Sequence, residues 1–429
     1  MLSPLGFGAS LKLVPHQGVL FLRPDPDDAD NDDVLLYGDV LVTLPQSKDI
    51  GKIVVRHVLN YTVSPPGYSS EQGQLEVDET EIEVNTRLQR GEHRFPWAIR
   101  LSQTTLPYER TAYGLVVHML EACAPGAGAF ASDLQASFRL KVVMSPVRDY
   151  YVQPVERRLD GALTELGPYS VVLRSPHLTV AGLLHISISL PSVPSDISLA
   201  SISISVAQST VIQLPSQPEK SINTPDQILN VVRLNRSIPR QPLSQTEAAL
   251  EPGVLYTAAG MPHDSTLLAV IPTGQAFDAQ YLTRLPNDQE LRPTTIHGVR
   301  TKRQYIFSIS HELRIEIVYS TPTSRQRLAK FRQPISFLSC CVSCDGALLP
   351  CYSQTDSDTS ASSRAVDVER TLRECVCERS MAQVMGQFPN FYAEALTVPT
   401  PVEGQAERRP KAIYVPGEND SSSSHASIE

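Results

Sequence analysis

The chain has 429 residues, 34 of them proline, and carries a formal net charge of -9 at pH 7. A chain of this length is too long for one ordinary hydrophobic core, so we expect two domains plus tails. The acidic balance argues against a general nucleic-acid binder, because contact with phosphates needs a basic surface. The many prolines, serines and threonines favour short strands and loops over helices.

The first residues and the cysteines indicate the compartment. Residues 1–12 lack a basic start followed by a sustained apolar stretch, so we predict no secretory signal peptide. No apolar run reaches the length of about 20 residues that spans a bilayer. Six of the seven cysteines lie between Cys340 and Cys377, and an odd, clustered set of thiols is typical of a reducing compartment. The sequence predicts a cytosolic protein.

Short apolar or alternating runs follow one another through the first 145 residues. Phe95–Leu101 and Ala112–Leu120 are too short for helices, and we expect them to form an antiparallel pair whose connection crosses over at Leu106-Pro107. About seven strands at such short spacing predict a β-sandwich. The other expected strands cover residues 11–14, 19–22, 34–44, 52–63 and 138–142, with two more over 75–88.

The chain changes character over residues 146–172, which are rich in proline and charge, and we expect an interdomain linker there. Residues 215–265, rich in proline, serine and glutamine, predict long loops. From 366 to 388 apolar side chains recur at helical spacing and predict a short amphipathic helix. Expected strands of this half cover residues 184–190, 202–206, 267–271, 305–309, 313–319 and 335–342.

Several strings, in matching order, resemble arrestin-like proteins. The string G-E-H-R-F-P-W-A-I-R-L at 91–101, the Leu106-Pro107 pair and residues 37–45 are similar to the arrestin amino-terminal domain. Residues 284–295 and 309–319, and the closing stretch 334–352, are similar to the carboxy-terminal domain of fungal α-arrestins.

The resemblance implies an all-β fold of two tandem immunoglobulin-like antiparallel β-sandwiches, that is, an arrestin-like fold. Residues 1–145 would form the amino-terminal sandwich and residues 173–352 the carboxy-terminal one, joined by the linker 146–172. Residues 353–429 would form a tail that is helical at 366–388 and otherwise mostly disordered.

The most specific functional motif is Pro65, Pro66 and Tyr68 within S-P-P-G-Y. A Pro-Pro pair presets a polyproline conformation and an aromatic two positions later fills a groove, as WW domains require of P-P-x-Y ligands. The same residues suit a plain turn between two strands, and both interpretations stay open. A weaker L-P-x-Y variant consists of Leu349, Pro350 and Tyr352, where packing at a domain boundary is the alternative.

Basic side chains are candidates for contacts with acidic or phosphorylated cargo, because guanidinium groups pair bidentately with phosphate. A solvated strand face is the alternative for each of them. These candidates are Arg139, Lys141, Arg300, Lys302 and Arg303.

The cysteines offer C-x-x-C at 341–344 and C-x-C at 375–377, but these spacings are not those of a known zinc module. We therefore expect buried thiols and neither a metal nor another cofactor. His118 and His311 lie in apolar runs and are expected to be core or edge histidines. No nucleophile elbow, phosphate-binding loop or H-E-x-x-H motif is present, so no catalytic residue is predicted.

The family resemblance implies a cytosolic trafficking adaptor that is recruited to the plasma membrane or endosomes. It would hold the cytosolic tails of membrane proteins and present them to a WW-domain, HECT-type ubiquitin ligase for ubiquitin-dependent endocytosis and sorting. One alternative is an arrestin-fold sorting or signalling scaffold on endosomes that recruits no ligase. Another is a secreted sugar- or protein-binding sandwich, which the missing signal peptide disfavours.

Overall fold

The computed structural model describes residues 8–22, 33–145, 155–235, 276–296 and 305–342, together with residues 377 and 427–428. Within these ranges the regular structure is almost entirely β, and the helical part is limited to short 3-10 turns such as η1 at Ala129–Ala131. The predicted all-β class is confirmed. No helix among the described residues is long and apolar enough to cross a membrane.

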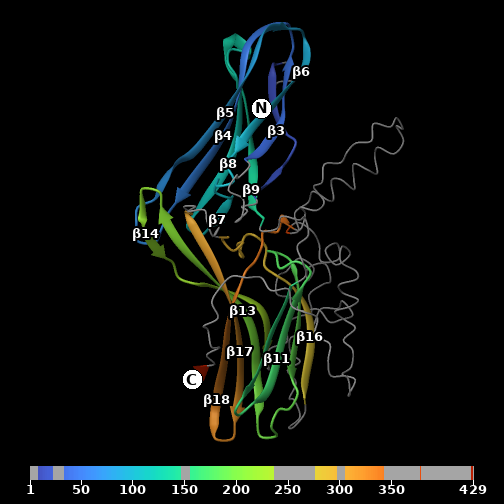
Figure 1. Ribbon diagram of the computed structural model, residues 1–429, viewed down its shortest axis with the longest axis vertical. Coiled ribbons are helices and arrows are strands. Elements are labelled where there is room, and N and C mark those ends of the chain that lie inside the picture. Colours follow the sequence, from blue (N-terminus) through green and yellow to red (C-terminus); the bar gives the residue numbers. More distant parts are fainter. Residues whose placement is uncertain are drawn as a thin grey trace, which may run out of the picture.

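The first half of the chain forms two sheets around one core (Figure 1). β1 (Ser10–Pro15), β3 (Val34–Leu44) and β6 (Gly91–Leu101) make a three-stranded antiparallel sheet. The second sheet has the order β2-β9-β8-β4-β5, with β7 added to β8. Its strands are β2 (Val19–Leu22), β4 (Lys48–Val63), β5 (Glu71–Leu88), β7 (Glu109–Thr111), β8 (Gly114–Ala124) and β9 (Leu134–Met144).

The second half repeats this arrangement around another core. One sheet has the order β10-β11-β12-β16, and the other has the order β14-β13-β17-β18-β19, with β15 also on β13. The first sheet consists of β10 (Val155–Leu163), β11 (Gly167–Ser175), β12 (Leu183–Leu190) and β16 (Phe277–Arg284). The second consists of β13 (Ser198–Leu214), β14 (Gln217–Asn223), β15 (Gln227–Asn235), β17 (Phe307–Thr321), β18 (Ser324–Ile335) and β19 (Ser427–Ile428).

Strand β17 shows why these residues form strands. Its side chains alternate between buried and half-exposed or exposed positions from Phe307 to Tyr319, the period of two that a pleated strand requires. Its buried side chains from Leu313 to Tyr319 line the second core, while Arg314 and Glu316 point the other way. Alternation of this kind places one face of a sheet on a core and the other toward water.

A third cluster of buried side chains joins the two halves. Leu59 and Val116 of the first half pack with Ile212 and Phe307 of the second, and Phe307 is fully buried. Gly114 makes this approach possible: a Cβ there would lie 2.0 Å from the Thr62 carbonyl oxygen and 2.8 Å from the Phe307 ring, and its φ is +153°. The two halves therefore meet through close packing, with the β13–β14 hairpin lying beside the ends of β4 and β5 (Figure 1).

The strand pairing corrects several expectations. The strands expected at Phe95–Leu101 and Ala112–Leu120 exist as β6 and β8, but they lie in different sheets and do not pair, because β6 pairs with β3 whereas β8 pairs with β4 and β9. The connection at Leu106 thus crosses from one sheet to the other. The first half is also not wholly antiparallel, since β2 runs parallel to β9.

Element boundaries differ in five places. Residues 75–88 belong to one long strand instead of two, and the runs at 305–309 and 313–319 join into β17. Residues 155–172, expected in the linker, form β10 and most of β11, and part of the expected 215–265 loop forms β14 and β15. The closing strand ends at Ile335 rather than beginning there.

The structure leaves two expected elements and the expected domain limits untested. The expected strand at 267–271 and the amphipathic helix at 366–388 lie outside the described residues. The domain limits 1–145 and 173–352 remain predictions.

Candidate functional site

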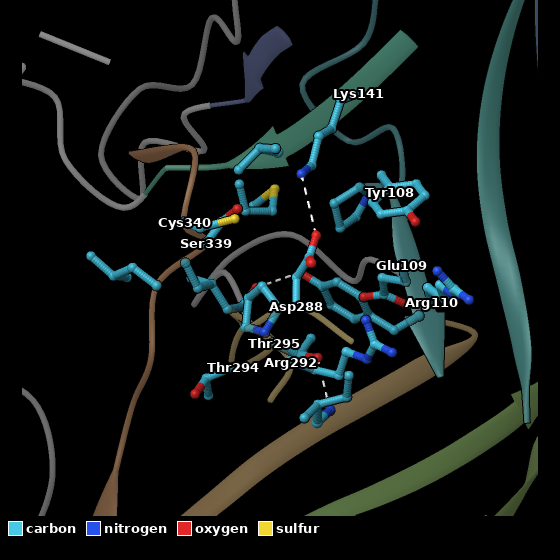
Figure 2. A pocket seen from close by; sticks show the side chains of 18 residues that line it. Tyr108, Glu109, Arg110, Lys141, Asp288, Arg292, Thr294, Thr295, Ser339 and Cys340 are labelled. Atoms are coloured by element: carbon cyan, nitrogen blue, oxygen red, sulfur yellow. Dashed lines mark hydrogen bonds and ion pairs between the residues drawn. The ribbon is translucent and has the colours of Figure 1, made fainter. Parts of the chain in front are cut away.

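A cavity of about 60 Å³ lies where the two halves meet (Figure 2). Its walls come from residues 107–110 at β7, the end of β9, residues 288–296 after β16 and residues 338–340 after β18. Because one enclosed water needs roughly 10–15 Å³, the cavity has room for about four to six waters. It therefore suits a few waters or a small group rather than a drug-sized ligand.

An ion pair crosses the junction beside this cavity. Lys141 on β9 places its Nζ 3.6 Å from Oδ2 of Asp288, in the loop after β16, and both side chains are partly exposed. Figure 2 shows the two groups pointing toward each other from opposite halves of the molecule. A pair at this exposure contributes about 1 kcal/mol or less. Its importance is positional, because it brings a cation of the first half to an anion of the second.

The ring of Tyr108 is contacted by two cationic side chains of β9. Its backbone N–H donates a hydrogen bond to the Val142 carbonyl at 2.7 Å, which fixes the segment against β9. The Arg139 guanidinium lies 5.2 Å from the centre of the Tyr108 ring, and the Lys141 ammonium lies 6.0 Å from it. Contacts of a cation with an aromatic face contribute about 0.5–1 kcal/mol at exposed sites. Of these two predicted basic residues, Arg139 is exposed and Lys141 half-buried.

Arg292 lines the opposite wall and is anchored by its own backbone. Its N–H donates to Oε1 of Gln208 at 2.7 Å, and its guanidinium donates to the Gln289 carbonyl at 2.9 Å. Burial lowers the pKa of the guanidinium, with Asp288 opposing this effect and Arg110 adding to it. Arginine stays charged even so, because its ordinary pKa lies above 12.

The buried His311 keeps the loop that carries Asp288 and Arg292 on the sheet. Its Nε2 lies 3.1 Å from Oε1 of Gln208, and its Nδ1 lies 2.8 Å from Oγ1 of Thr294. A carbonyl oxygen only accepts, so Nε2 carries the proton and Nδ1 accepts from the threonine hydroxyl. Burial lowers the pKa of His311 to about 4. The expectation of a core or edge histidine is confirmed here and at the fully buried His118.

Four cations therefore surround the cavity and its rim, against two carboxylates. An anionic group brought to this junction would meet guanidinium and ammonium donors from both halves, which is the arrangement that binds carboxylates and phosphates. The cations are Arg110, Arg139, Lys141 and Arg292, and the carboxylates are Asp288 and Glu109.

The predicted WW-binding motif forms a tight turn between β4 and β5. The Tyr68 N–H donates to the Pro65 carbonyl at 3.2 Å, and Gly67 has a φ of +77°, the geometry of a type II turn with glycine at its third position. Tyr68 is 46% exposed, whereas Pro65 is buried. The Lys220 ammonium of β14 lies 4.4 Å from the centre of the Tyr68 ring. The motif is thus accessible at Pro66 and Tyr68 but not at Pro65.

The other predicted site residues lie outside the described part of the chain. They are Leu349, Pro350 and Tyr352 of the second motif and the basic residues Arg300, Lys302 and Arg303.

Sequence reasoning missed Tyr108, Asp288 and Arg292 as members of the site. Each of them has a proline within two positions, in P-Y, L-P-N-D and L-R-P. This proximity is the one feature of the sequence that indicates an ordered polar loop. That signal does not reveal that Lys141 would lie opposite Asp288, because the two are brought together only by the contact between the halves.

One group of side chains in the described residues could hold a metal ion. Ligand atoms of Asp288, Cys340 and Cys377 all lie within 4.8 Å of one another. Cys340 and its neighbour Cys341 are buried, as expected for thiols in this stretch.

Comparison with known proteins found no family model that matches the chain and no curated protein with significant similarity to it.

Proposed function

We propose that this protein is a non-catalytic trafficking adaptor of the arrestin type, which binds the acidic or phosphorylated cytosolic tail of a membrane protein. The cationic junction carries the proposal. Arg110 and Lys141 of the first half and Arg292 of the second line one cavity, and Arg139 lies beside it over the Tyr108 ring. An anionic group bound there would therefore meet cations of both halves. The sequence resemblance to arrestin-like proteins supports the same function independently.

The β-sandwich character suits this task. Sheets that pack on continuous cores are rigid, and binding residues are commonly held on loops and strand ends of such scaffolds. Binding would rest on geometry and charge, with association weakened by added salt. In this proposal the adaptor works by co-localising its partners, because tethering raises their effective concentration.

The test is binding of an acidic peptide with one phosphoserine, compared with its unphosphorylated form, by fluorescence anisotropy. Replacing Arg139 and Arg110 together by alanine should weaken binding of the phosphopeptide by roughly tenfold or more, since each charge-assisted hydrogen bond contributes about 1.5–3 kcal/mol. The matched control replaces Arg87 and Arg100, two exposed arginines away from the cavity. Equal affinity of both double variants would refute the cargo site.

The proposed route to ubiquitination is recruitment of a WW-domain ligase through Pro65, Pro66 and Tyr68. The exposed tyrosine supports it, but the turn must open before the buried Pro65 can enter a WW groove. Capture of the full chain by an isolated WW domain should fall when Tyr68 is replaced by alanine, and should persist when the exposed Leu75 of β5 is replaced instead.

A second candidate function is a sorting or signalling scaffold on endosomes that recruits no ligase. The burial of Pro65 and the hydrogen bond that closes the turn favour it, because a WW ligand is read in an extended polyproline conformation. Absence of WW capture by the wild-type chain would select the scaffold over the ligase adaptor, whereas capture that is unchanged in the Tyr68→Ala variant would remove this motif from the proposal.

A further inference from the structure

We propose that Asp288, Cys340 and Cys377 bind a thiophilic divalent cation such as Zn²⁺. The three come from separate segments: the loop after β16, the turn after β18, and the stretch that holds Cys377. The proposal goes beyond the adaptor function and does not depend on it.

The ligand atoms are close enough to be brought onto one ion. They lie within 4.8 Å of one another, whereas bonds of about 2.3 Å to sulfur and 2.0–2.2 Å to oxygen place tetrahedral ligands roughly 3.5–3.8 Å apart. Closing the difference takes movements of about 1 Å, which side-chain rotation supplies. The backbone need not be rebuilt, because the three ligand atoms already lie within 4.8 Å of one another.

The chemistry of the donors selects the type of ion. Two thiolates with one carboxylate form a soft donor set that suits Zn²⁺, while Mg²⁺ and Ca²⁺ prefer oxygen ligands alone. Two thiolates and a carboxylate carry three negative charges, so the site with a divalent cation bound has a net charge of minus one. Lys141, whose Nζ is 3.6 Å from Oδ2 of Asp288, offsets that remaining charge.

The fourth position of the ion would face the cavity. Asp288 and Cys340 both line that cavity, which has room for several waters. A site with three protein ligands and one water therefore matches the space on hand. Binding would fasten Cys377 to the two loops beside the cationic junction, so that metal occupancy and the conformation of that junction become coupled.

The experiment uses the full chain, freed of metal and kept reduced with a reagent that does not chelate. Zn²⁺ is titrated against a coloured chelator, and Co²⁺ is then used to look for a sulfur-to-cobalt charge-transfer band. We expect one tight equivalent of Zn²⁺ and the charge-transfer band. Cys340→Ser, Cys377→Ser and Asp288→Asn should each weaken Zn²⁺ binding, the two serine variants by roughly 100-fold or more, because even outer-shell substitutions cost 10–100-fold.

The matched control is Cys123→Ser, which removes a thiol of β8 that lies outside the group and should leave the affinity unchanged. Urea unfolding of each variant in the absence of metal identifies any variant whose Zn²⁺ affinity is lost because the protein is misfolded. Equal Zn²⁺ affinity of the wild type and the Cys377→Ser variant, in folded proteins, would overturn the site. So would a Cys340–Cys377 disulfide in protein isolated with its thiols blocked, detected by peptide mass.

Discussion

Acid should destabilise this protein through a buried pair of histidines in the first half. His118 Nδ1 lies 2.9 Å from His57 Nε2, and both rings are fully buried. His118 Nε2 lies 2.8 Å from the Leu106 carbonyl oxygen, and His57 Nδ1 lies 3.3 Å from Oδ2 of Asp78. Because a carbonyl only accepts, His118 carries its proton on Nε2 and accepts from His57 at Nδ1.

Burial, with a smaller contribution from the charge of His57, lowers the pKa of His118 from 6.5 to about 3. Burial also lowers the pKa of His57, against the opposing effect of Asp78. A folded-state pKa below the unfolded value means that protons bind preferentially to the unfolded chain. The stabilisation is therefore fully present above pH 6.5 and is lost as the pH falls toward 3. For His118 alone the loss is about 2 kcal/mol between pH 6.5 and 4.5.

The assay is urea unfolding of the wild type and of His118→Gln across this pH range. Glutamine keeps an N–H donor for the Leu106 carbonyl but does not titrate. Between pH 6.5 and 4.5 the variant should therefore lose about 2 kcal/mol less of its free energy of unfolding than the wild type loses. The control is Leu140→Ala, the fully buried cross-strand partner of His118. This substitution should lower the free energy of unfolding by about 2–5 kcal/mol. The loss should be similar at every pH. Parallel pH curves for the wild type and His118→Gln would refute the reasoning.

Three further substitutions test the packing and the charges. Gly114→Ala should lower the free energy of unfolding by roughly 1–3 kcal/mol through its clash at the junction, whereas Gly51→Ala, with no atom within 4 Å of its added Cβ, should do much less; equal melting temperatures would contradict this. Phe307→Ala should cost about 3–5 kcal/mol in urea unfolding and loosen the junction, seen as a larger radius in small-angle scattering. The Arg94 hydrogen bond lowers the pKa of the buried Asp39 to about 2, so Asp39→Asn should cost about 2 kcal/mol at pH 7 and progressively less from pH 3.8 down to 2; a cost that does not change with pH would exclude the ionic explanation.

The sequence alone determined the class of the fold and most of its strands. Residues 19–22 and 34–44 form strands within the predicted limits, because alternation of apolar and polar side chains is a local property that the pleat converts directly into buried and exposed faces. The same alternation identified His118 and His311 as interior residues. For these features the information lies within a few neighbouring positions.

Only the tertiary structure decided which strands pair and what surrounds the site. Alternation shows which side of a strand is buried but not its neighbour, so β6 and β8 could be taken for a pair although they lie in different sheets. The contact of Lys141 with Asp288 and the burial of Pro65 also depend on how the chain packs over long distances. These features arise from contacts between segments far apart in sequence, and the free energy of such contacts is not encoded in any short stretch.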